Sequence, residues 1–243
     1  MPAFNEAEVI GELIEHIGSS LNSTAYHILV VDDGSSDQTG AIARELSSKH
    51  PVTVLTHEVN RGAGQAIGTG IQHVCEHFNQ DDLVVTMDAD NTQNPDLILE
   101  MLEAAGTGSD VVIASRFVPG GGQSGVPWHR SLLSHGARVF FRVLFPMNIK
   151  DYTSFYRLYR VALLQQAIER YSPLLEARGF AAILELLIKL RQFKPSIAQV
   201  PLHLRYDLKA GDSKMKIFKT LAEYAVLLTR LKLMSFRAPP KRS

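Results

Sequence analysis

Two aspartates stand one residue apart at the end of a short apolar run, in the segment LVVTMDADNTQNPD of residues 83–96. If the backbone is still extended at Asp88, the side chains of Asp88 and Asp90 leave it on the same side. Two adjacent carboxylates repel each other unless a positive charge joins them. A hard divalent cation does so, with water and phosphate oxygens completing octahedral coordination. The pair therefore predicts an Mg²⁺ or Mn²⁺ site against a diphosphate, with a solvated acidic turn as the alternative.

A second acidic group follows the apolar run in VVDDGSSDQT, residues 30–39. Gly34 turns the chain there, and the serines or Asp37 could cap the helix that follows. A turn followed by a helix cap would explain Gly34 and the serines, but it does not explain why both Asp32 and Asp33 precede the turn. A carboxylate at this place could accept a hydrogen bond from a nucleobase N–H or a ribose hydroxyl.

The third loop is NRGAGQAIGTG, residues 60–70. Gly62 and Gly64 fit the first two positions of a dinucleotide-binding fingerprint, but Ile67 occupies the third, which argues against a dinucleotide-dependent oxidoreductase. The glycines would still let the backbone approach a ligand, and Arg61 could meet a phosphate.

Apolar runs alternate with helical patterns along the first half of the chain. The expected strands lie within residues 27–33, 52–58, 82–90 and 110–117, and the expected helices within 37–50, 63–78 and 95–105. This alternation predicts a doubly wound, mostly parallel α/β sheet, in which ligands bind beyond the carboxyl ends of the strands. A Gly/Pro loop at 117–128 follows, then helices near 130–145, 161–171 and 176–191 and a strand-like segment at 196–207.

The two ends of the chain are unusual for this fold. MPAFNEAEVIGELIEHI opens with a turn and a helix, so we expect the sheet to lack its first strand. Residues 214–234 predict a final amphipathic helix, and residues 214–243 hold eight Lys or Arg against one acid, Glu223. We expect a catalytic domain over 1–206 and a basic helix and tail over 207–243. That helix could lie on a membrane surface or pack on the domain.

Composition excludes several classes of protein. The 243 residues are 45% hydrophobic and have a formal net charge of zero, which suits one large core and gives no overall footprint for nucleic acid. A single cysteine, Cys75, allows no internal disulfide and no cysteine-based zinc site, and it is compatible with a reducing compartment. No stretch approaches the ~20 apolar residues that cross a bilayer.

Taken together, these segments resemble the family 2 glycosyltransferases with a GT-A fold, above all dolichyl-phosphate mannose synthases and related polyprenyl-phosphate hexosyltransferases. The resemblance covers nearly the whole chain in the family's order. The segments are PAFNE, VVDDGSSDQT, NRGAG, MDADNTQNPD, ASRFVPGG, HRSLLSHGA, DYTSFYRLYR, GFAAILELL and VPLHLRYDLKAGDSKMK.

The resemblance implies a role for each matching residue. The nucleotide-sugar site would comprise Pro2, Ala3, Phe4, Glu6, Asp32, Asp33, Arg61, Gly62, Asp88 and Ala89. Asp88 and Asp90 would bind the metal, with Thr92 or Gln93 as the third ligand. Phosphate would be bound by Arg116, Arg130, Ser134, Ser213 and Lys214, together with Arg205 or Lys209. The catalytic set would be Asp88, Asp90, Arg116 and Arg130.

The resemblance favours transfer of mannose from GDP-mannose onto a dolichyl or other polyprenyl phosphate. No Glu-Asp pair stands where hydroxyl-directed relatives carry a catalytic base. A phosphomonoester needs none, because its second pKa is about 6 and it is mostly dianionic at neutral pH. One in-line displacement would invert the anomeric centre. The alternatives are UDP-glucose or another donor, and a catalytically silent nucleotide-sugar-binding protein. We expect a location at the cytoplasmic face of a membrane, held by the lipid surface or by a small membrane-anchoring subunit.

Overall fold

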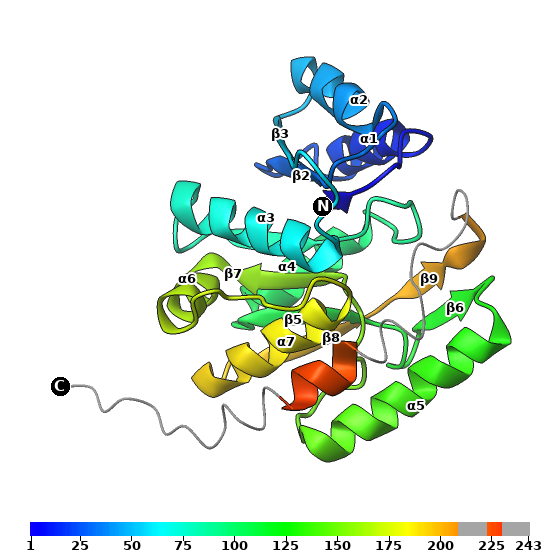
Figure 1. Ribbon diagram of the computed structural model, residues 1–243, viewed down its shortest axis with the longest axis vertical. Helices are drawn as coiled ribbons and strands as arrows, with labels where there is room; N and C mark the ends of the chain where they lie inside the picture. Colours follow the sequence, from blue (N-terminus) through cyan, green and yellow to red (C-terminus); the bar gives the residue numbers. More distant parts are fainter. Residues whose placement is uncertain (209–222, 230–243) are drawn as a thin grey trace.

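The strands form two main sheets in the computed structural model, which describes residues 1–208 and 223–229 apart from the side chains of residues 129–133 (Figure 1). The first sheet is parallel, and its strands are β1 (Pro2–Ala3), β2 (Ile28–Asp32) and β3 (Val52–Thr56) in that order. The second comprises, in spatial order, β4 (Leu83–Thr86), β7 (Arg157–Arg160), β5 (Val111–Ser115) and β8 (Ile197–Pro201). A separate parallel pair joins β6 (Gly122–Ser124) to β9 (His203–Arg205).

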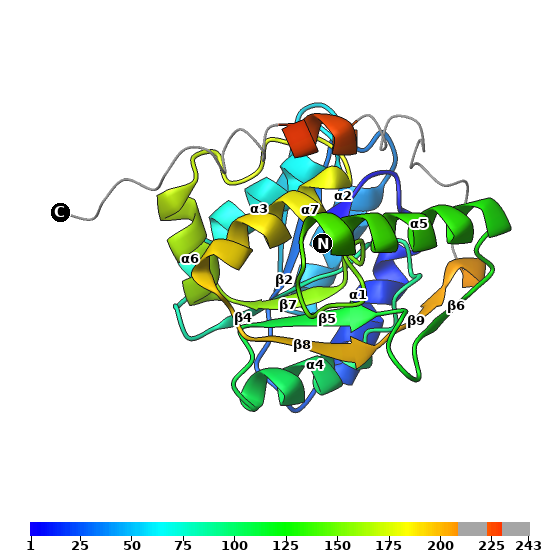
Figure 2. The same cartoon turned by 90° about the horizontal axis from the view of Figure 1, so that it is seen from below.

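Helices cover both faces of the sheets. They are α1 (Ile10–Ser20), α2 (Thr39–Glu45), α3 (Ala63–His77), α4 (Leu97–Gly106), α5 (Trp128–Leu144), α6 (Val161–Arg170) and α7 (Ala181–Leu190), with 3₁₀ turns at Leu46–Ser48, Arg191–Phe193 and Tyr206–Leu208. Figure 2 shows α4 on one side of the second sheet and α3 and α7 on the other.

The alternation of β5 explains this layering. Val111 and Ile113 belong to a core shared with α3, α6 and α7, whereas Val112 and Ala114 belong to a core shared with α1 and α4. Successive side chains of a strand point to opposite faces, so a strand with four consecutive apolar residues must be covered on both faces. The predicted doubly wound, mostly parallel arrangement is confirmed.

Three features differ from the sequence-based expectations. β7 runs antiparallel to both β4 and β5 and was not predicted as a strand. The loop expected over residues 117–128 contains β6. The first strand is present rather than missing, although β1 has only two residues. The backbone N–H of Val31 donates to Met1 O and that of Asp33 donates to Ala3 O, both at 2.8 Å, so β1 pairs with the carboxyl end of β2.

The last described segment, residues 223–229, is helical and packs on the body of the molecule. Leu227 is buried, and the ring of Tyr224 lies 5.0 Å from that of Phe141 in an edge-to-face arrangement. Tyr224 and Leu228 belong to the apolar stripe predicted for residues 214–234, so this part of the stripe faces the core. The rest of that predicted helix lies outside the described residues. Among the described helices, none is long and apolar enough to span a bilayer.

Candidate active site

The carboxyl ends of the parallel strands bring distant loops together. The backbone N–H of Leu202 donates to Ser115 O at 3.0 Å, and that of Arg205 donates to Thr92 O at 2.9 Å. The hydroxyl of Tyr156 donates to Asn94 O at 2.9 Å. The loops after β4, β5 and β8 and the segment before β7 therefore meet at one edge, where a doubly wound sheet binds its ligands.

The two aspartates at this edge are each held by a polar neighbour. Gln93 forms a closed pair with Asp88, in which the Gln93 Nε2 donates to Oδ2 at 2.7 Å and the Asp88 backbone N–H donates to Gln93 Oε1 at 3.0 Å. The Thr92 hydroxyl and backbone N–H both donate to Asp90 Oδ1, at 2.7 and 3.2 Å. Asn91 takes a left-handed turn, with φ of 60°, between them. The predicted third ligands, Thr92 and Gln93, are thus buried partners that orient the carboxylates.

Asp33 organises the loop that follows β3. Its Oδ1 is 2.7 Å from His57 Nδ1 and accepts the Arg61 backbone N–H at 2.9 Å, while its Oδ2 accepts the Gly62 N–H at 2.8 Å. Asp33 and His57 are almost completely buried. The structure therefore gives Asp33 a positioning role, and its expected contact with a nucleotide stays a prediction.

The segment after β1 is joined to the loop after β2. The Asn5 backbone N–H donates to Ser35 Oγ at 3.0 Å, and that of Glu6 donates to Thr39 Oγ1 at 2.8 Å. Asp32 is buried, and its Oδ1 accepts the Ser35 N–H at 3.1 Å. The predicted nucleotide residues of these two segments, from Pro2 to Glu6 and at Asp32 and Asp33, are thus brought together.

The glycine loop rests on the segment before α7. Gly62 has φ of +93°, which favours glycine, and Gly64 N–H donates to Arg178 O at 2.8 Å. That segment is held from α7 by Glu185, whose Oε2 accepts the backbone N–H of Ala177 at 2.9 Å. Lys189, also buried, donates to Glu185 Oε1 at 2.6 Å and to a backbone carbonyl. A buried ion pair therefore supports the loop that carries the exposed Arg61.

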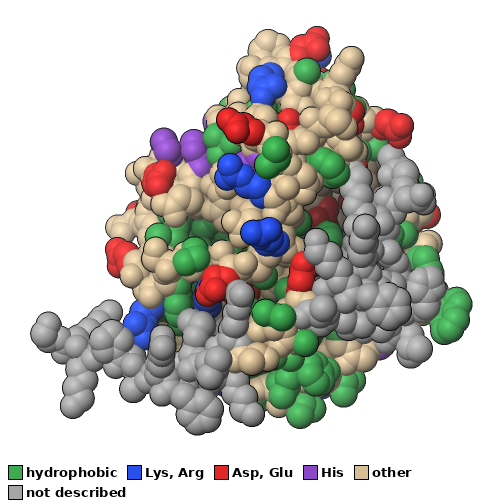
Figure 3. Space-filling view, in the orientation of Figure 1, with side chains coloured by type: hydrophobic (Ala, Val, Ile, Leu, Met, Phe, Trp, Pro, Cys, Tyr) green, Lys and Arg blue, Asp and Glu red, His purple; other side chains and the backbone are tan. Residues whose placement is uncertain are grey.

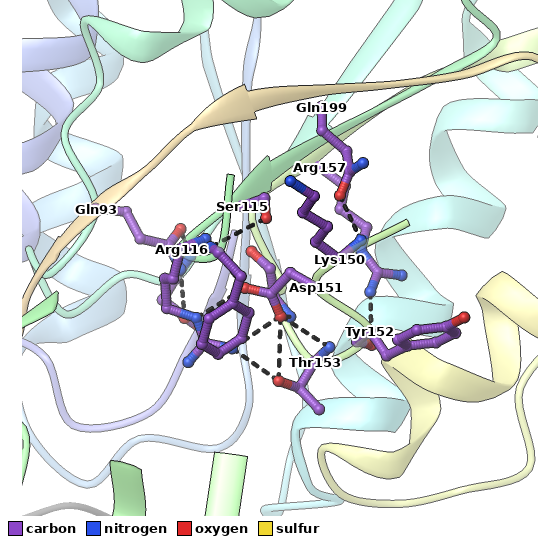
Figure 4. A network of polar contacts seen from close by, with 12 residues as sticks. Gln93, Ser115, Arg116, Lys150, Asp151, Tyr152, Thr153, Arg157 and Gln199 are labelled. Atoms are coloured by element: carbon purple, nitrogen blue, oxygen red, sulfur yellow. Dashed lines mark hydrogen bonds and ion pairs between the residues drawn. The ribbon is translucent and has the colours of Figure 1, made fainter. Parts of the chain in front are cut away.

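Arg116 is held by a buried carboxylate (Figure 4). Its Nε and Nη2 donate to the two oxygens of Asp151, each at 2.8 Å, and Nη2 also donates to Thr153 Oγ1 at 2.7 Å. Burial alone would raise the pKa of Asp151, but the guanidinium and the backbone N–H donors outweigh it and hold that pKa below its usual range. Burial likewise opposes the charge of Arg116, and Asp151 overcomes it and raises the Arg116 pKa.

The other predicted phosphate-binding residues are less completely described. Ser134 lies half-buried on α5, and Arg130 is on the same helix, with a side chain outside the described residues. Arg205 is exposed and pairs with Asp207, its Nη2 lying 2.7 Å from Oδ2. Lys209, Ser213 and Lys214 lie outside the described residues.

Sequence reasoning missed the buried groups behind the site. His57 and Asp151 gave no local signal, because the residues they bind are far along the chain. Glu185 and Lys189 did give one: two opposite charges four residues apart interrupt the apolar helix AAILELLIKL. Such residues are seldom buried unless paired, so this spacing was sufficient to predict the ion pair.

Comparison with known proteins identifies the family. The model for "Glycosyl transferase family 2" matches residues 1–167. A dolichol-phosphate mannosyltransferase from Pyrococcus furiosus is 36% identical over 234 residues, which cover 95% of this chain and 62% of that protein. A polyprenol monophosphomannose synthase from Mycolicibacterium smegmatis is 32% identical over 218 residues, covering 88% of this chain and 79% of the relative. The chain thus spans less than two thirds of the length of the Pyrococcus relative.

The fold comparison agrees with the family match. A structure of glucosyl-3-phosphoglycerate synthase from Mycobacterium tuberculosis, in complex with Mn²⁺ and UDP-glucose, superposes with a TM-score of 0.68 at 21% identity. The match covers 95% of this chain and 76% of that one. The chain therefore belongs to glycosyl transferase family 2, the GT-A glycosyltransferases that its sequence resembles.

Proposed function

We propose that this chain is a metal-dependent, inverting glycosyltransferase that moves mannose from GDP-mannose onto a polyprenyl phosphate of the dolichyl type. The two curated relatives act, by their names, on dolichol and polyprenol phosphates, which supports the acceptor class. The observation that carries the proposal is the pair Asp88 and Asp90, which follow the carboxyl end of β4 and are oriented there by Gln93 and Thr92. The cytoplasmic face of a membrane is the proposed location.

The donor set suits Mg²⁺ or Mn²⁺ bound together with a diphosphate. Asp88 and Asp90 are only partly buried, and the described residues contain no group of three or more His, Cys, Asp or Glu that could enclose an ion. A site with two carboxylates fits these cations, which keep water and take oxygens from substrate phosphates. When bound there, such a cation would neutralise charge on the departing nucleoside diphosphate. An assay of transfer with each cation would distinguish Mg²⁺ from Mn²⁺.

The acceptor side needs cations rather than a base. A phosphate dianion attacks an anomeric carbon without losing a proton, so the protein has only to hold it in line. Asp151 and Thr153 engage the Nε and Nη2 of Arg116, and among the described residues Nη1 has no hydrogen-bond partner. We assign Nη1 to a phosphate oxygen, with Arg130 as its proposed companion. The buried pair would thus keep the Arg116 guanidinium fixed at the end of β5.

An exposed apolar surface on α5 suits an acceptor whose tail stays in a membrane. Val139, Phe140, Val143 and Leu144 are 59%, 49%, 75% and 45% exposed. Figure 3 shows hydrophobic side chains gathered at the lower edge of the molecule, where Figure 1 places this end of α5. Arg142 lies within the same turn, as expected for a helix that meets anionic lipid. We propose direct membrane contact here, with a small membrane subunit as the alternative partner.

The metal assignment is tested by Asp88→Asn and Asp90→Asn. Each change removes a charge that a cation requires at a partly exposed site, so transfer should be lost while the melting temperature stays near that of the parent chain. Asp81→Asn is the matched control, because Asp81 is an exposed acid before the opposite end of β4. It should retain full transfer. Transfer that persists in both site variants, or in excess chelator, would rule out the metal assignment.

A further inference from the structure

A pocket of about 600 Å³ lies between the loop that follows α5 and the turn that follows α7. The loop contributes residues 147–149, and the turn contributes Arg191, Gln192 and Lys194. Ile197, the first residue of β8, forms part of the same wall as the turn. The pocket is therefore at the amino end of β8, whereas the candidate active site lies at the carboxyl ends of the strands.

The loop after α5 is held in place by two side chains. The hydroxyl of Tyr152 donates to Phe145 O at 2.8 Å. The Oε1 of Gln199, in β8, accepts the backbone N–H of Lys150 at 2.6 Å (Figure 4). The segment between these two contacts is the one that lines the pocket. This wall is thus formed in the absence of a ligand, as is usual for small-molecule sites.

The opposite wall is a tight turn that carries two cations. Helix α7 continues into the 3₁₀ turn Arg191–Phe193, and Lys194 then takes a left-handed conformation with φ of 53°. The Lys194 backbone N–H donates to Arg191 O at 3.0 Å, which places both residues on one turn. Both residues are exposed, and within the described part of the chain neither side chain has a hydrogen bond or an ion pair. Two positive charges are therefore available at the pocket.

The surroundings of the turn do not neutralise these charges. Asp110 lies beside the turn, but its Oδ2 already accepts the backbone N–H and the hydroxyl of Ser196, each at 2.8 Å. Burial raises the pKa of Tyr152, and the charges of Arg142 and Arg191 are among the causes that oppose this rise. Arg142 belongs to the last turn of α5, so cations from two helices lie near the loop between them. Such an arrangement attracts an anion.

The lining indicates the chemistry of the ligand. Arginine and lysine are the usual protein partners of phosphate oxygens, and the amides of Asn148 and Gln192 can hydrogen-bond to hydroxyl groups. The volume falls within the range of ~300–1,000 Å³ that is typical of ligand pockets. The exposed apolar surface of α5, residues 139–144, directly precedes the pocket loop in the chain. A membrane that meets this surface would therefore bring lipid headgroups to the pocket.

We propose that this pocket binds the phosphate group of an anionic phospholipid headgroup. Arg191 and Lys194 pair with the phosphate oxygens, and Asn148 and Gln192 contact the polar part of the headgroup. The bound headgroup fixes the orientation in which α5 meets the membrane. The inference rests on the membrane contact proposed above for α5, and it does not depend on which sugar is transferred.

The test compares flotation of the intact chain with two kinds of vesicle, phosphatidylcholine alone and phosphatidylcholine with phosphatidylglycerol. The site variant carries Arg191→Gln and Lys194→Gln. The control variant carries Arg44→Gln and Lys49→Gln, which remove the same charge from exposed residues in and after α2. The site variant should bind phosphatidylglycerol vesicles about 20-fold more weakly than the parent chain, roughly fivefold for each cation. The control should bind as the parent does, because its changes lie beyond the range of the surface field.

Two further measurements locate the effect. Hydrogen exchange of residues 147–149 and 191–194 should slow when phosphatidylglycerol vesicles are added to the parent chain, and it should not slow in the site variant. Transfer to a short polyprenyl phosphate without vesicles should be equal in the site variant and the parent, because the pocket lies away from the candidate active site. Loss of that transfer in the site variant would assign the pocket to the reaction and would overturn the proposal.

The remaining outcomes separate the pocket from its alternatives. Equal losses of binding in the site and control variants, or equal flotation of the parent with both kinds of vesicle, would show that the pocket recognises no headgroup. Exchange that slows with inorganic phosphate but not with vesicles would assign the pocket to a soluble phosphate compound. If the parent floats with neither kind of vesicle, the membrane contact of α5 is itself wrong and this inference fails with it.

Discussion

Replacing Asp151 by asparagine tests how Arg116 is held. The change keeps the shape of the side chain but removes the charge that binds the guanidinium. Asp151 is inaccessible to solvent and also accepts the backbone N–H of Thr153 and Ser154, at 3.1 and 3.0 Å. The side chain of Arg116 is 11% exposed, so solvent screens the pair weakly. Removing one member of such a buried pair costs about 3–5 kcal/mol of unfolding free energy, because the remaining charge loses its partner.

That cost corresponds to a measurable fall in thermal stability. For a domain of this size about 1 kcal/mol shifts the melting temperature by ~2–4 °C, so Asp151→Asn should lower it by roughly 6–20 °C. Asp207→Asn is the control, because it breaks the exposed pair with Arg205 and should leave the melting temperature unchanged. The double variant Arg116→Met with Asp151→Leu should recover part of the loss, since no unpaired charge remains.

The pH dependence gives a second, independent measurement. The pKa of Asp151 is lower in the folded chain than the usual value of ~3.9 in an unfolded one. The stabilisation is therefore fully present above ~pH 5 and is lost as the pH falls through the folded pKa. The difference in melting temperature between the parent chain and Asp151→Asn should stay constant from pH 8 to 5 and should become smaller below pH 4. The assignment of a stabilising Arg116–Asp151 pair would be refuted if Asp151→Asn lowered the melting temperature by less than 2 °C at pH 7. It would also be refuted if the difference in melting temperature did not become smaller below pH 4.

Three further changes address the supporting loop, the buried pair of α7 and the apolar helix. Gly62→Ala should destabilise more than Gly108→Ala, as measured by urea unfolding, because both glycines have positive φ but only at Gly62 would the new methyl group meet a backbone carbonyl. Equal losses would contradict that steric argument. Glu185→Gln should cost about 3–5 kcal/mol in the same assay by leaving Lys189 buried and unpaired, and adding Lys189→Met should restore part of it. Val143→Glu should reduce flotation with anionic liposomes without changing the melting temperature; unchanged flotation would exclude this surface from membrane contact.

The sequence was sufficient to predict those elements whose own apolar residues show that they are buried. The strand at 111–115 is buried throughout and apolar from Val111 to Ala114. Helix α1 repeats its buried residues at Ile10, Leu13, Ile14 and Ile17, which is the spacing of one helical face. β7 escaped prediction because its segment RLYR is half charged, and its buried Arg157 donates to the carbonyls of Tyr152 and Ile183. Its antiparallel direction depends on the path of the chain through α5, which no local pattern encodes.

The residues of the candidate site also fall into a group that could be predicted from the sequence and a group that could not. The acidic residues at strand ends were found because position and charge are both visible in the sequence. Their positioning partners were not, since Asp33 meets His57 and Arg116 meets Asp151 only after the sheet has formed. The expected absence of the first strand was wrong, because Pro2 and Ala3 pair with Val31 and Asp32 and form a two-residue strand at the edge of the first sheet.

Transfer itself is the most direct test of the proposed function. The intact chain would be offered GDP-mannose, UDP-glucose and other nucleotide sugars in parallel, with a short polyprenyl phosphate and either Mg²⁺ or Mn²⁺. The proposed function predicts that a polyprenyl phosphate mannose with an inverted anomeric centre forms from GDP-mannose, and that chelator abolishes its formation. If UDP-glucose were a better donor than GDP-mannose, the proposed donor would be wrong. Binding of nucleotide sugars without transfer to any polyprenyl phosphate, in the presence of either cation, would contradict the proposed function.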